Sequence, residues 1–289
     1  MRVMVTGAGG QVGADVARLL EGTAEVAAHT RASLDLEKPD DIRWCVRDVH
    51  PDVIVNAAAY TAVDRAESEE DRAHAVNGVA PGILAEEARR AGALLIHYST
   101  DYVFDGELDR PYLETDATNP LSAYGRTKLE GEEAVAAAGG RHLILRTSWV
   151  YAPRGRNFML TMLRFAAERD ELRVVDDQRG APTASVQIAR ATIALLEATR
   201  EHSGIYHATA SGETTWFGFA GAIFDERRRA VGEAFRMPKL VPIRTVDYPT
   251  PARRPKNSVL SNAKLENVFG IRLGDWREGL AETIAQVPV

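Results

Sequence analysis

The amino end of the chain reads Arg2-Val-Met-Val-Thr-Gly7-Ala-Gly9-Gly10-Gln-Val-Gly13. A short β-branched run leads into a glycine loop, and an apolar periodic stretch over Val12–Leu20 follows. This order predicts a strand, a tight turn and a helix. In this spacing Gly7 permits the sharp turn, Gly10 lets the backbone approach a diphosphate, and Gly13 permits close helix–strand packing. The helix N-terminus then faces the anion.

Strand-like and helical segments alternate from this loop as far as residue 150. Several of the strands are continuously apolar, which is typical of a sheet covered by helices on both faces. We therefore expect an α/β fold with a Rossmann-type, doubly wound parallel sheet whose ligands bind beyond the carboxyl ends of the strands. The predicted strands are Val3–Thr6, Glu25–His29, Val53–Ala57, Leu94–Ser99 and Leu143–Val150. The predicted helices are Val12–Leu20, Asp40–Val49, Val79–Ala91 and Ala123–Ala138.

The pattern is looser after residue 150. It predicts a smaller α/β C-terminal part that binds substrate, so we expect an NAD(P)-binding domain over 1–150 and a mainly substrate-binding part over 151–289. The helix near 186–199 is also compatible with a place in the first domain. The predicted helices are Phe158–Glu168, Val186–Thr199, Phe217–Arg229 and Trp276–Gln286, the predicted strands are Leu172–Val175 and Ile205–Ala208, and Pro238–Arg254 is expected to be irregular.

Composition limits the class of protein. The chain has 289 residues, of which 45% are hydrophobic, and a net charge of −6, so it favours neither nucleic acid nor an acidic membrane surface as a partner. The one cysteine, Cys45, excludes an intrachain disulfide and suits a reducing compartment. No apolar run reaches transmembrane length, and a strand at the N-terminus leaves no room for a signal peptide. We expect a cytoplasmic protein.

Tyr124 and Lys128 stand four residues apart, about one helical turn, and so share a helix face. A phenol titrates near pH ~10, and a cation beside it lowers that pKa. Thr100, at the end of a predicted strand, supplies a hydroxyl that can hold a carbonyl against the phenol. Thr100, Tyr124 and Lys128 thus form a candidate proton-delivery unit for reducing a ketone.

Taken together, these features resemble the extended short-chain dehydrogenase/reductases and, more narrowly, the dTDP-4-dehydrorhamnose reductases. The segments that carry the narrower resemblance span nearly the whole chain in order. They are Asn56-Ala-Ala-Ala-Tyr-Thr-Ala-Val-Asp-Arg-Ala-Glu67, His97-Tyr-Ser-Thr-Asp-Tyr-Val-Phe-Asp-Gly106, Arg146-Thr-Ser-Trp-Val-Tyr151, Asp177-Gln-Arg-Gly-Ala-Pro-Thr183, Ser211-Gly-Glu-Thr-Thr-Trp216 and Pro249-Thr-Pro-Ala-Arg-Arg-Pro255. The resemblance implies that NAD(P)H reduces the C4 ketone of dTDP-4-dehydro-β-L-rhamnose to give dTDP-L-rhamnose.

The resemblance also implies residue roles. Tyr124 donates the proton, Lys128 holds the nicotinamide ribose, and Thr100 bonds the ketone oxygen, with Ser99 as the alternative hydroxyl. The candidate cofactor-binding residues are Gly7, Gly10, Gln11, Val12, Gly13, Thr30, Arg31, Asp35, Leu36, Ala59, Tyr60, Thr61, Tyr124 and Lys128. The candidate substrate-binding residues are Thr100, Asp101, Tyr102, Trp149, Arg254 and Asn257, and a metal site is not expected.

The residues at the end of the second predicted strand bear on cofactor choice. An acidic residue there disfavours NADP, but Thr30 takes that place and Arg31 is suited to a 2′-phosphate. NADPH is therefore the expected cofactor, and NADH is also compatible. Some family members dimerise around a magnesium ion held by carboxylates. The matching positions here are Asp15, Val186 and Gln286, so we expect that any homodimer is not metal-linked.

Two other functions stay open. One is reduction of another dTDP-4-keto-6-deoxyhexose, because the sequence does not determine the stereochemistry at C4. The other is a non-catalytic regulatory subunit of the methionine adenosyltransferase type, which shares this fold. The presence of Thr100, Tyr124 and Lys128 together argues for the enzyme.

Overall fold

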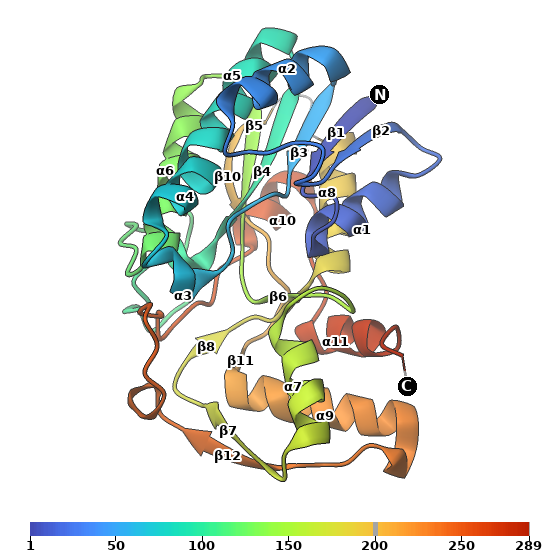
Figure 1. The fold of residues 1–289 in the computed structure, drawn as a ribbon, viewed down its shortest axis with the longest axis vertical. Coiled ribbons are helices and arrows are strands. Elements are labelled where there is room, and N and C mark those ends of the chain that lie inside the picture. Colours follow the sequence, from blue (N-terminus) through green and yellow to red (C-terminus); the bar gives the residue numbers. More distant parts are fainter. Residues whose placement is uncertain (199–201, 289) are drawn as a thin grey trace.

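The structure, a computed structural model, describes residues 1–198 and 202–288. Its centre is a parallel six-stranded sheet with the order β10-β5-β4-β3-β1-β2 (Figure 1). The strands are β1 (Arg2–Thr6), β2 (Glu25–His29), β3 (Val53–Asn56), β4 (Leu94–Thr100), β5 (His142–Thr147) and β10 (Gly204–His207). The predicted Rossmann-type α/β fold is confirmed.

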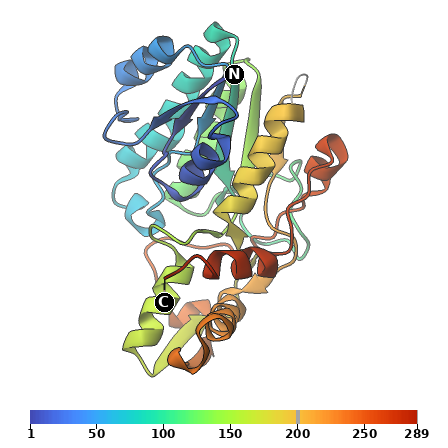
Figure 2. The ribbon, with the colours of Figure 1, turned by 90° about the vertical axis from the view of Figure 1, so that its right-hand side faces the viewer.

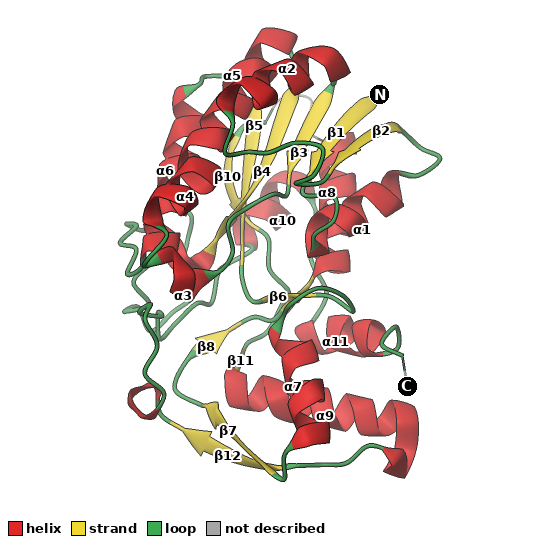
Figure 3. Ribbon diagram, in the orientation of Figure 1, coloured by secondary structure: helices red, strands yellow, loops and turns green. Residues whose placement is uncertain are grey.

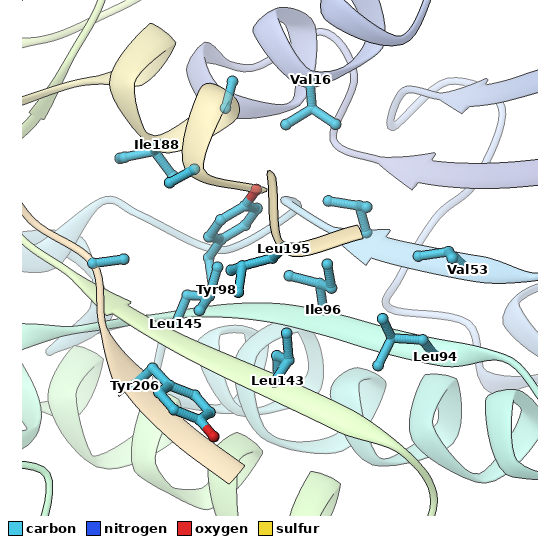
Figure 4. Close-up of a cluster of buried hydrophobic side chains, with 14 of the residues drawn as sticks. Val16, Val53, Leu94, Ile96, Tyr98, Leu143, Leu145, Ile188, Leu195 and Tyr206 are labelled. Carbon is cyan, nitrogen blue, oxygen red and sulfur yellow. The ribbon is translucent and has the colours of Figure 1, made fainter. Parts of the chain in front are cut away.

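Helices cover both faces of this sheet (Figure 3). Along β1, Val3 and Val5 point to one face and Met4 points to the other, as the two-residue period of a strand requires. The first face packs against α1 (Gln11–Leu20), α8 (Ser185–Ala198) and α10 (Ala263–Phe269). The second packs against α2 (Pro39–Val49), α5 (Ala80–Ala91) and α6 (Ala123–Ala137). In Figure 4, side chains of the strands meet Val16 of α1 and Ile188 and Leu195 of α8.

The sheet draws on both halves of the chain. After β5 the chain leaves the sheet, and it returns with α8, which packs on α1, and with β10, which pairs with β5. The helix predicted near 186–199 therefore lies on the N-terminal sheet, although its expected end at residue 199 lies outside the described residues. A division of the chain at residue 150 stays a prediction.

The remaining elements form a smaller layer below the sheet (Figures 1 and 2). It contains α7 (Phe158–Glu168), α9 (Trp216–Val231) and α11 (Trp276–Ile284) around buried aromatic side chains such as Phe219 and Trp276. Three short strand pairs complete it. They are β6 (Val150–Tyr151) with β9 (Thr183–Ala184), β7 (Glu171–Val175) with β12 (Lys239–Ile243), and β8 (Arg179–Gly180) with β11 (Thr214–Thr215).

Some predicted boundaries were wrong. The strand expected to reach Val150 ends at Thr147, because Trp149 has a left-handed backbone with φ of 47° that turns the chain out of the sheet. The segment expected to be irregular over 238–254 contains β12. Proline is tolerated there because a two-stranded sheet consists only of edge strands, whose N–H groups need not all pair.

Helices were also missed. Two short helices, α3 (Val63–Ala66) and α4 (Glu70–His74), precede α5, and a π-helical turn over Ala75–Val79 joins α4 to α5. The predicted helix Val79–Ala91 agrees with α5 to within one residue, and the helical segments before it were not predicted. The five-residue α4 has a single buried residue, Ala73, and so carries no apolar periodicity, and the short α10 is another helix without a strong pattern. Across residues 1–198 and 202–288, no helix is long and apolar enough to cross a membrane.

Candidate active site

The glycine loop has the shape that the spacing predicts. Gly7 has φ of 67°, and a Cβ atom there would lie 2.6 Å from the backbone nitrogen of Ala58. A Cβ atom on Gly13 would overlap the carbonyl oxygen of Gly7, so α1 packs directly on the loop. Gly10 is the N-cap of α1, and no side chain caps the helix. The first N–H groups of α1 are therefore available to an anion.

This loop borders a cleft of about 730 Å³ at the carboxyl ends of the strands. All of the predicted cofactor-binding residues except Gly13 line it. They are Gly7, Gly10, Gln11, Val12, Thr30, Arg31, Asp35, Leu36, Ala59, Tyr60, Thr61, Tyr124 and Lys128. Gly13 acts through the helix packing described above. The size of the cleft, its uncapped helix and its glycine cradle fit a dinucleotide.

Charged residues gather where β2 ends. The Arg31 guanidinium lies 2.6 Å from the Glu37 carboxylate, and Arg72 of α4 binds the same oxygen at 3.0 Å. All three side chains line the cleft. Arg72 was missed in the sequence because it comes from a helix 41 residues after Arg31, and only the tertiary structure brings the two cations together.

Tyr124 lies at the inner end of the cleft, in the first turn of α6. Ser122 caps this helix by accepting a hydrogen bond from the Gly125 amide at 3.2 Å. A Cβ atom on Gly125 would overlap the carbonyl oxygen of Tyr102, so the helix start lies directly on the loop after β4. The Tyr102 ring meets the Tyr124 ring edge-on, with centroids 5.6 Å apart. This packing places the phenol beside Thr100.

The pKa of Tyr124 differs from our expectation. Burial raises it to about 12, and a hydrogen bond with the Thr100 hydroxyl opposes the shift only in part. Lys128, which was expected to lower this pKa, instead donates to the Tyr98 carbonyl oxygen at 2.7 Å and contacts the His97 ring. Burial lowers the pKa of Lys128 itself to about 8. Tyr124 is therefore in its protonated, acid form at neutral pH.

Ser99, Thr100 and Asp101 follow Tyr98 where β4 ends. The Thr100 hydroxyl donates to Asp101 at 3.0 Å and accepts from the Tyr102 amide at 3.2 Å. Asp101 is 2% exposed, and burial raises its pKa to about 6. Ser99, the alternative to Thr100, donates its hydroxyl to the buried Glu132 carboxylate. Ser99 lines the cleft and Thr100 does not, but Thr100 is the hydroxyl that bonds the Tyr124 phenol, so the hydrogen bonding favours Thr100.

The predicted substrate-binding residues lie beyond the cleft lining, and their surroundings differ. The Trp149 ring stacks on Trp216 with centroids 3.5 Å apart, so one of its faces is covered. Arg254 makes a two-pronged ion pair with Asp64 of α3 at 2.8 and 3.0 Å. The structure does not support a ligand role for Asn257. Asn257 is 4% exposed, and its amide bonds the backbone of residues 108, 110 and 259. The side chain therefore holds a loop in place.

Arg154 is another residue that the sequence did not reveal. Its guanidinium lies 2.6 Å from the Asp15 carboxylate and donates to the Gln11 carbonyl oxygen at 3.2 Å, beside the glycine loop. Asp15 is buried and also accepts from the Ser185 hydroxyl at 2.6 Å. In the described part of the chain, no group of three or more His, Cys, Asp or Glu side chains is placed to hold a metal ion.

A glycine loop, a dinucleotide-sized cleft lined by a tyrosine and a lysine, and a threonine hydroxyl bonded to that tyrosine define an oxidoreductase of the extended short-chain dehydrogenase/reductase class. The family model described as RmlD substrate binding domain matches residues 1–289. A dTDP-4-dehydrorhamnose reductase from Burkholderia thailandensis is 52% identical over 285 residues, which cover 96% of each chain. The chain belongs to the dTDP-4-dehydrorhamnose reductase family.

Solved structures agree with this assignment. The dTDP-4-dehydrorhamnose reductase of Clostridium acetobutylicum superimposes with a TM-score of 0.92 at 40% identity and 98% coverage of both chains. The enzyme of Bacillus anthracis, solved in complex with NADP, gives a TM-score of 0.92 at 32% identity and 99% coverage of both chains.

Proposed function

We propose that this protein uses NADPH, or NADH, to reduce the C4 ketone of dTDP-4-dehydro-β-L-rhamnose to dTDP-L-rhamnose. The observation that carries the proposal is the position of the Tyr124 phenol, next to Thr100 and at the inner end of a dinucleotide-sized cleft. The family membership supports the choice of sugar nucleotide, and the NADP bound to the Bacillus anthracis relative supports the choice of cofactor.

In this proposal the bound cofactor supplies a hydride to C4. The hydroxyls of Thr100 and Tyr124 hold the ketone oxygen between them. As negative charge develops on that oxygen, Tyr124 donates its proton. A phenol with a pKa of about 12 keeps its proton until a strongly basic alkoxide forms. Lys128, which lines the same cleft, binds the ribose of the cofactor.

The remaining candidate substrate residues are proposed to bind the sugar nucleotide. Asp101 and Tyr102 face the sugar hydroxyls, the half-buried Trp149 contacts a flat group, and Arg254 meets the diphosphate by exchanging Asp64 for phosphate. We omit Asn257 from this set because its amide is already bonded to backbone.

We further propose that residues 1–150, with the returning α8 and β10, bind the cofactor and that most of 151–289 binds the sugar nucleotide. The protein is proposed to act in the cytoplasm and to form any homodimer without a metal. The cytoplasmic location rests on the chain's composition and its single cysteine, and the metal-free assembly rests on the occupied Asp15 carboxylate.

The test measures reduction of the 4-keto sugar nucleotide by NADPH. Absorbance monitors the reaction, and NMR identifies the product. Tyr124→Phe is expected to lower turnover by about 10²–10⁴-fold, the range typical of losing a general acid, with little change in NADPH affinity. Tyr206→Phe, which removes one hydroxyl from β10 on the sheet's far edge, serves as the matched control. Wild-type turnover in Tyr124→Phe would refute the proton-donor role.

The same assay separates the other two functions. A product with the other configuration at C4 would favour a different dTDP-4-keto-6-deoxyhexose reductase. Cofactor binding without any turnover on either sugar would favour the regulatory-subunit function.

A further inference from the structure

A chain of buried polar side chains crosses the sheet beneath the cleft. Lys128 Nζ lies 3.2 Å from His97 Nε2, His97 Nδ1 lies 3.0 Å from Asn56 Nδ2, and Asn56 Oδ1 accepts from the Thr6 hydroxyl at 2.6 Å. None of the four residues is more than 2% exposed. Thr6, Asn56 and His97 are register partners on β1, β3 and β4, so the parallel sheet itself sets these contacts.

The arrangement of donors and acceptors among these four side chains depends on the charge of Lys128. Because the Asn56 amide nitrogen donates, His97 Nδ1 must accept, and the neutral ring then carries its proton on Nε2. That N–H points at Lys128 Nζ. An ammonium has three donors and no acceptor. With this tautomer, the contact is therefore a hydrogen bond only when Lys128 is a neutral amine.

A second arrangement suits the charged lysine. If the Asn56 amide turns by half a rotation, its oxygen accepts from His97 Nδ1–H, and its nitrogen donates to the Thr6 hydroxyl, which can act as donor or acceptor. His97 Nε2 then carries a lone pair that accepts from the Lys128 ammonium. In both charge states of Lys128 each contact from Lys128 through His97 and Asn56 to Thr6 is thus a hydrogen bond, but with opposite histidine tautomers and opposite amide orientations.

We propose that Thr6, Asn56 and His97 form a two-state hydrogen-bond relay that couples the charge of Lys128 to the tautomer of His97. His97 is a positioning residue in this relay and stays neutral in both states, because burial and the nearby lysine lower its pKa well below the ordinary value. The other charged or titratable groups around Lys128 are Tyr124 and Glu132 on α6, and Arg146 on β5, which is paired with Glu132.

The relay connects Lys128 with the two loops that border the cleft. Thr6 immediately precedes Gly7 of the glycine loop, and Asn56 immediately precedes the loop that carries Ala59 and Tyr60. The functional meaning of the relay rests on the proposed role of Lys128 in cofactor binding. The relay itself concerns only the chain's own residues.

The tautomer can be measured in the cofactor-free protein by nitrogen NMR of labelled histidine rings, with His97→Gln to assign the signal. Between about pH 6 and about pH 10, a range that spans ordinary histidine and shifted lysine pKa values, His97 is expected to change from Nδ1–H to Nε2–H. The midpoint is expected at the pKa of Lys128, about 8. In Lys128→Met the tautomer is expected to be the same at every pH.

A single tautomer throughout in the wild type, a change that persists in Lys128→Met, or an imidazolium signal would overturn the relay. Asn56→Asp is a second variant, because its carboxylate only accepts and should hold His97 as Nδ1–H even at high pH. None of these measurements needs substrate. An inactive enzyme with the expected tautomer change would therefore refute the proposed reaction and leave the relay intact.

Discussion

Tyr124 and Lys128 lie one turn apart on α6, but their environments separate them. The phenol meets Thr100 and Tyr102, whereas the ammonium reaches back to β4. Neither group therefore offsets the effect of burial on the other. Burial raises the pKa of Tyr124 and lowers the pKa of Lys128. A tyrosine that begins in its acid form and a lysine that titrates near pH 8 suit a site that delivers a proton.

The raised pKa of Asp101 predicts a pH dependence. Its ordinary value of 3.8 becomes about 6, so the carboxylate that would bind sugar hydroxyls is lost as pH falls through about 6. The kcat/KM for the sugar nucleotide is expected to fall about tenfold per pH unit below that value. Asp101→Asn should lack this limb, and a limb that persists in Asp101→Asn would assign it to another group.

This loss of activity would not reflect unfolding caused by Asp101. A carboxyl whose pKa is raised in the folded state stabilises the fold most below its unfolded value, near 3.8, and this contribution is lost as pH rises through about 6. For this residue, stability and activity therefore change in opposite directions with pH. Circular dichroism at each pH provides the control.

Arg31 and Arg72 bind one oxygen of Glu37, which is the arrangement two cations would take around a phosphate. Arg31→Ala and Arg72→Ala are each expected to raise the KM for NADPH about tenfold or more, with a smaller effect on the KM for NADH. Arg43→Ala, on a half-buried arginine of α2 outside the cleft lining, is the matched control. Equal effects on both cofactors would place the 2′-phosphate elsewhere.

At the scale of elements, α6 is the helix that carries the proposed catalytic pair, Tyr124 and Lys128, and glycines let it approach its neighbours. A Cβ atom on Gly131 would overlap the carbonyl oxygen of Asn77 in the π-helical turn. Gly131→Ala is expected to lower the free energy of unfolding by about 1–3 kcal/mol, since backbone must move to admit the methyl group. The displacement of α6 should also lower turnover.

Gly221, inside α9, is the matched control for that substitution. A Cβ atom there would lie 3.9 Å from Leu240 Cδ1, which is an ordinary contact. Gly221→Ala is therefore expected to raise the free energy of unfolding by up to about 1 kcal/mol through helix propensity. Chemical denaturation measures both variants. Stabilisation by both alanines would show that α6 is not packed as closely as the structure has it.

Over the whole molecule, contacts from the C-terminal part hold the cofactor cleft. Arg154 bonds the glycine loop and pairs with Asp15, and Asn157 donates to the Gln11 side chain at 2.9 Å. On the opposite side, Arg254 pairs with Asp64 of α3. Segments more than 100 residues apart in sequence therefore meet at both ends of the site.

The occupied Asp15 carboxylate predicts how assembly responds to metal. Asp15 is bound by Arg154 and Ser185 of its own chain, and the two matching positions are Val186 and Gln286. Activity is expected to survive EDTA, and the mass from light scattering is expected to be the same with magnesium or EDTA. A magnesium-dependent mass would contradict this and would require Asp15 to leave its partners.

The sequence by itself determined five strands of the sheet, the glycine loop and the pair on α6, because these depend on local patterns, whereas the sixth strand, β10, returns from the C-terminal part. Alternating apolar runs, a glycine spacing and a four-residue interval need no knowledge of distant residues. It was predictable for the same reason that the candidate cofactor-binding residues would line one cleft, since strand ends in a parallel sheet meet at one edge. The family resemblance added the reaction and the substrate-side candidates.

Only the tertiary structure decided which distant groups complete the site. Arg72 joins Arg31, Arg154 joins the glycine loop, and Asn257 is turned inward to backbone, although no local pattern distinguishes these residues. The electrostatics were also beyond the sequence. A pKa depends on burial and on partners across the fold, so the spacing of Tyr124 and Lys128 placed them on one helix face but did not determine their protonation states.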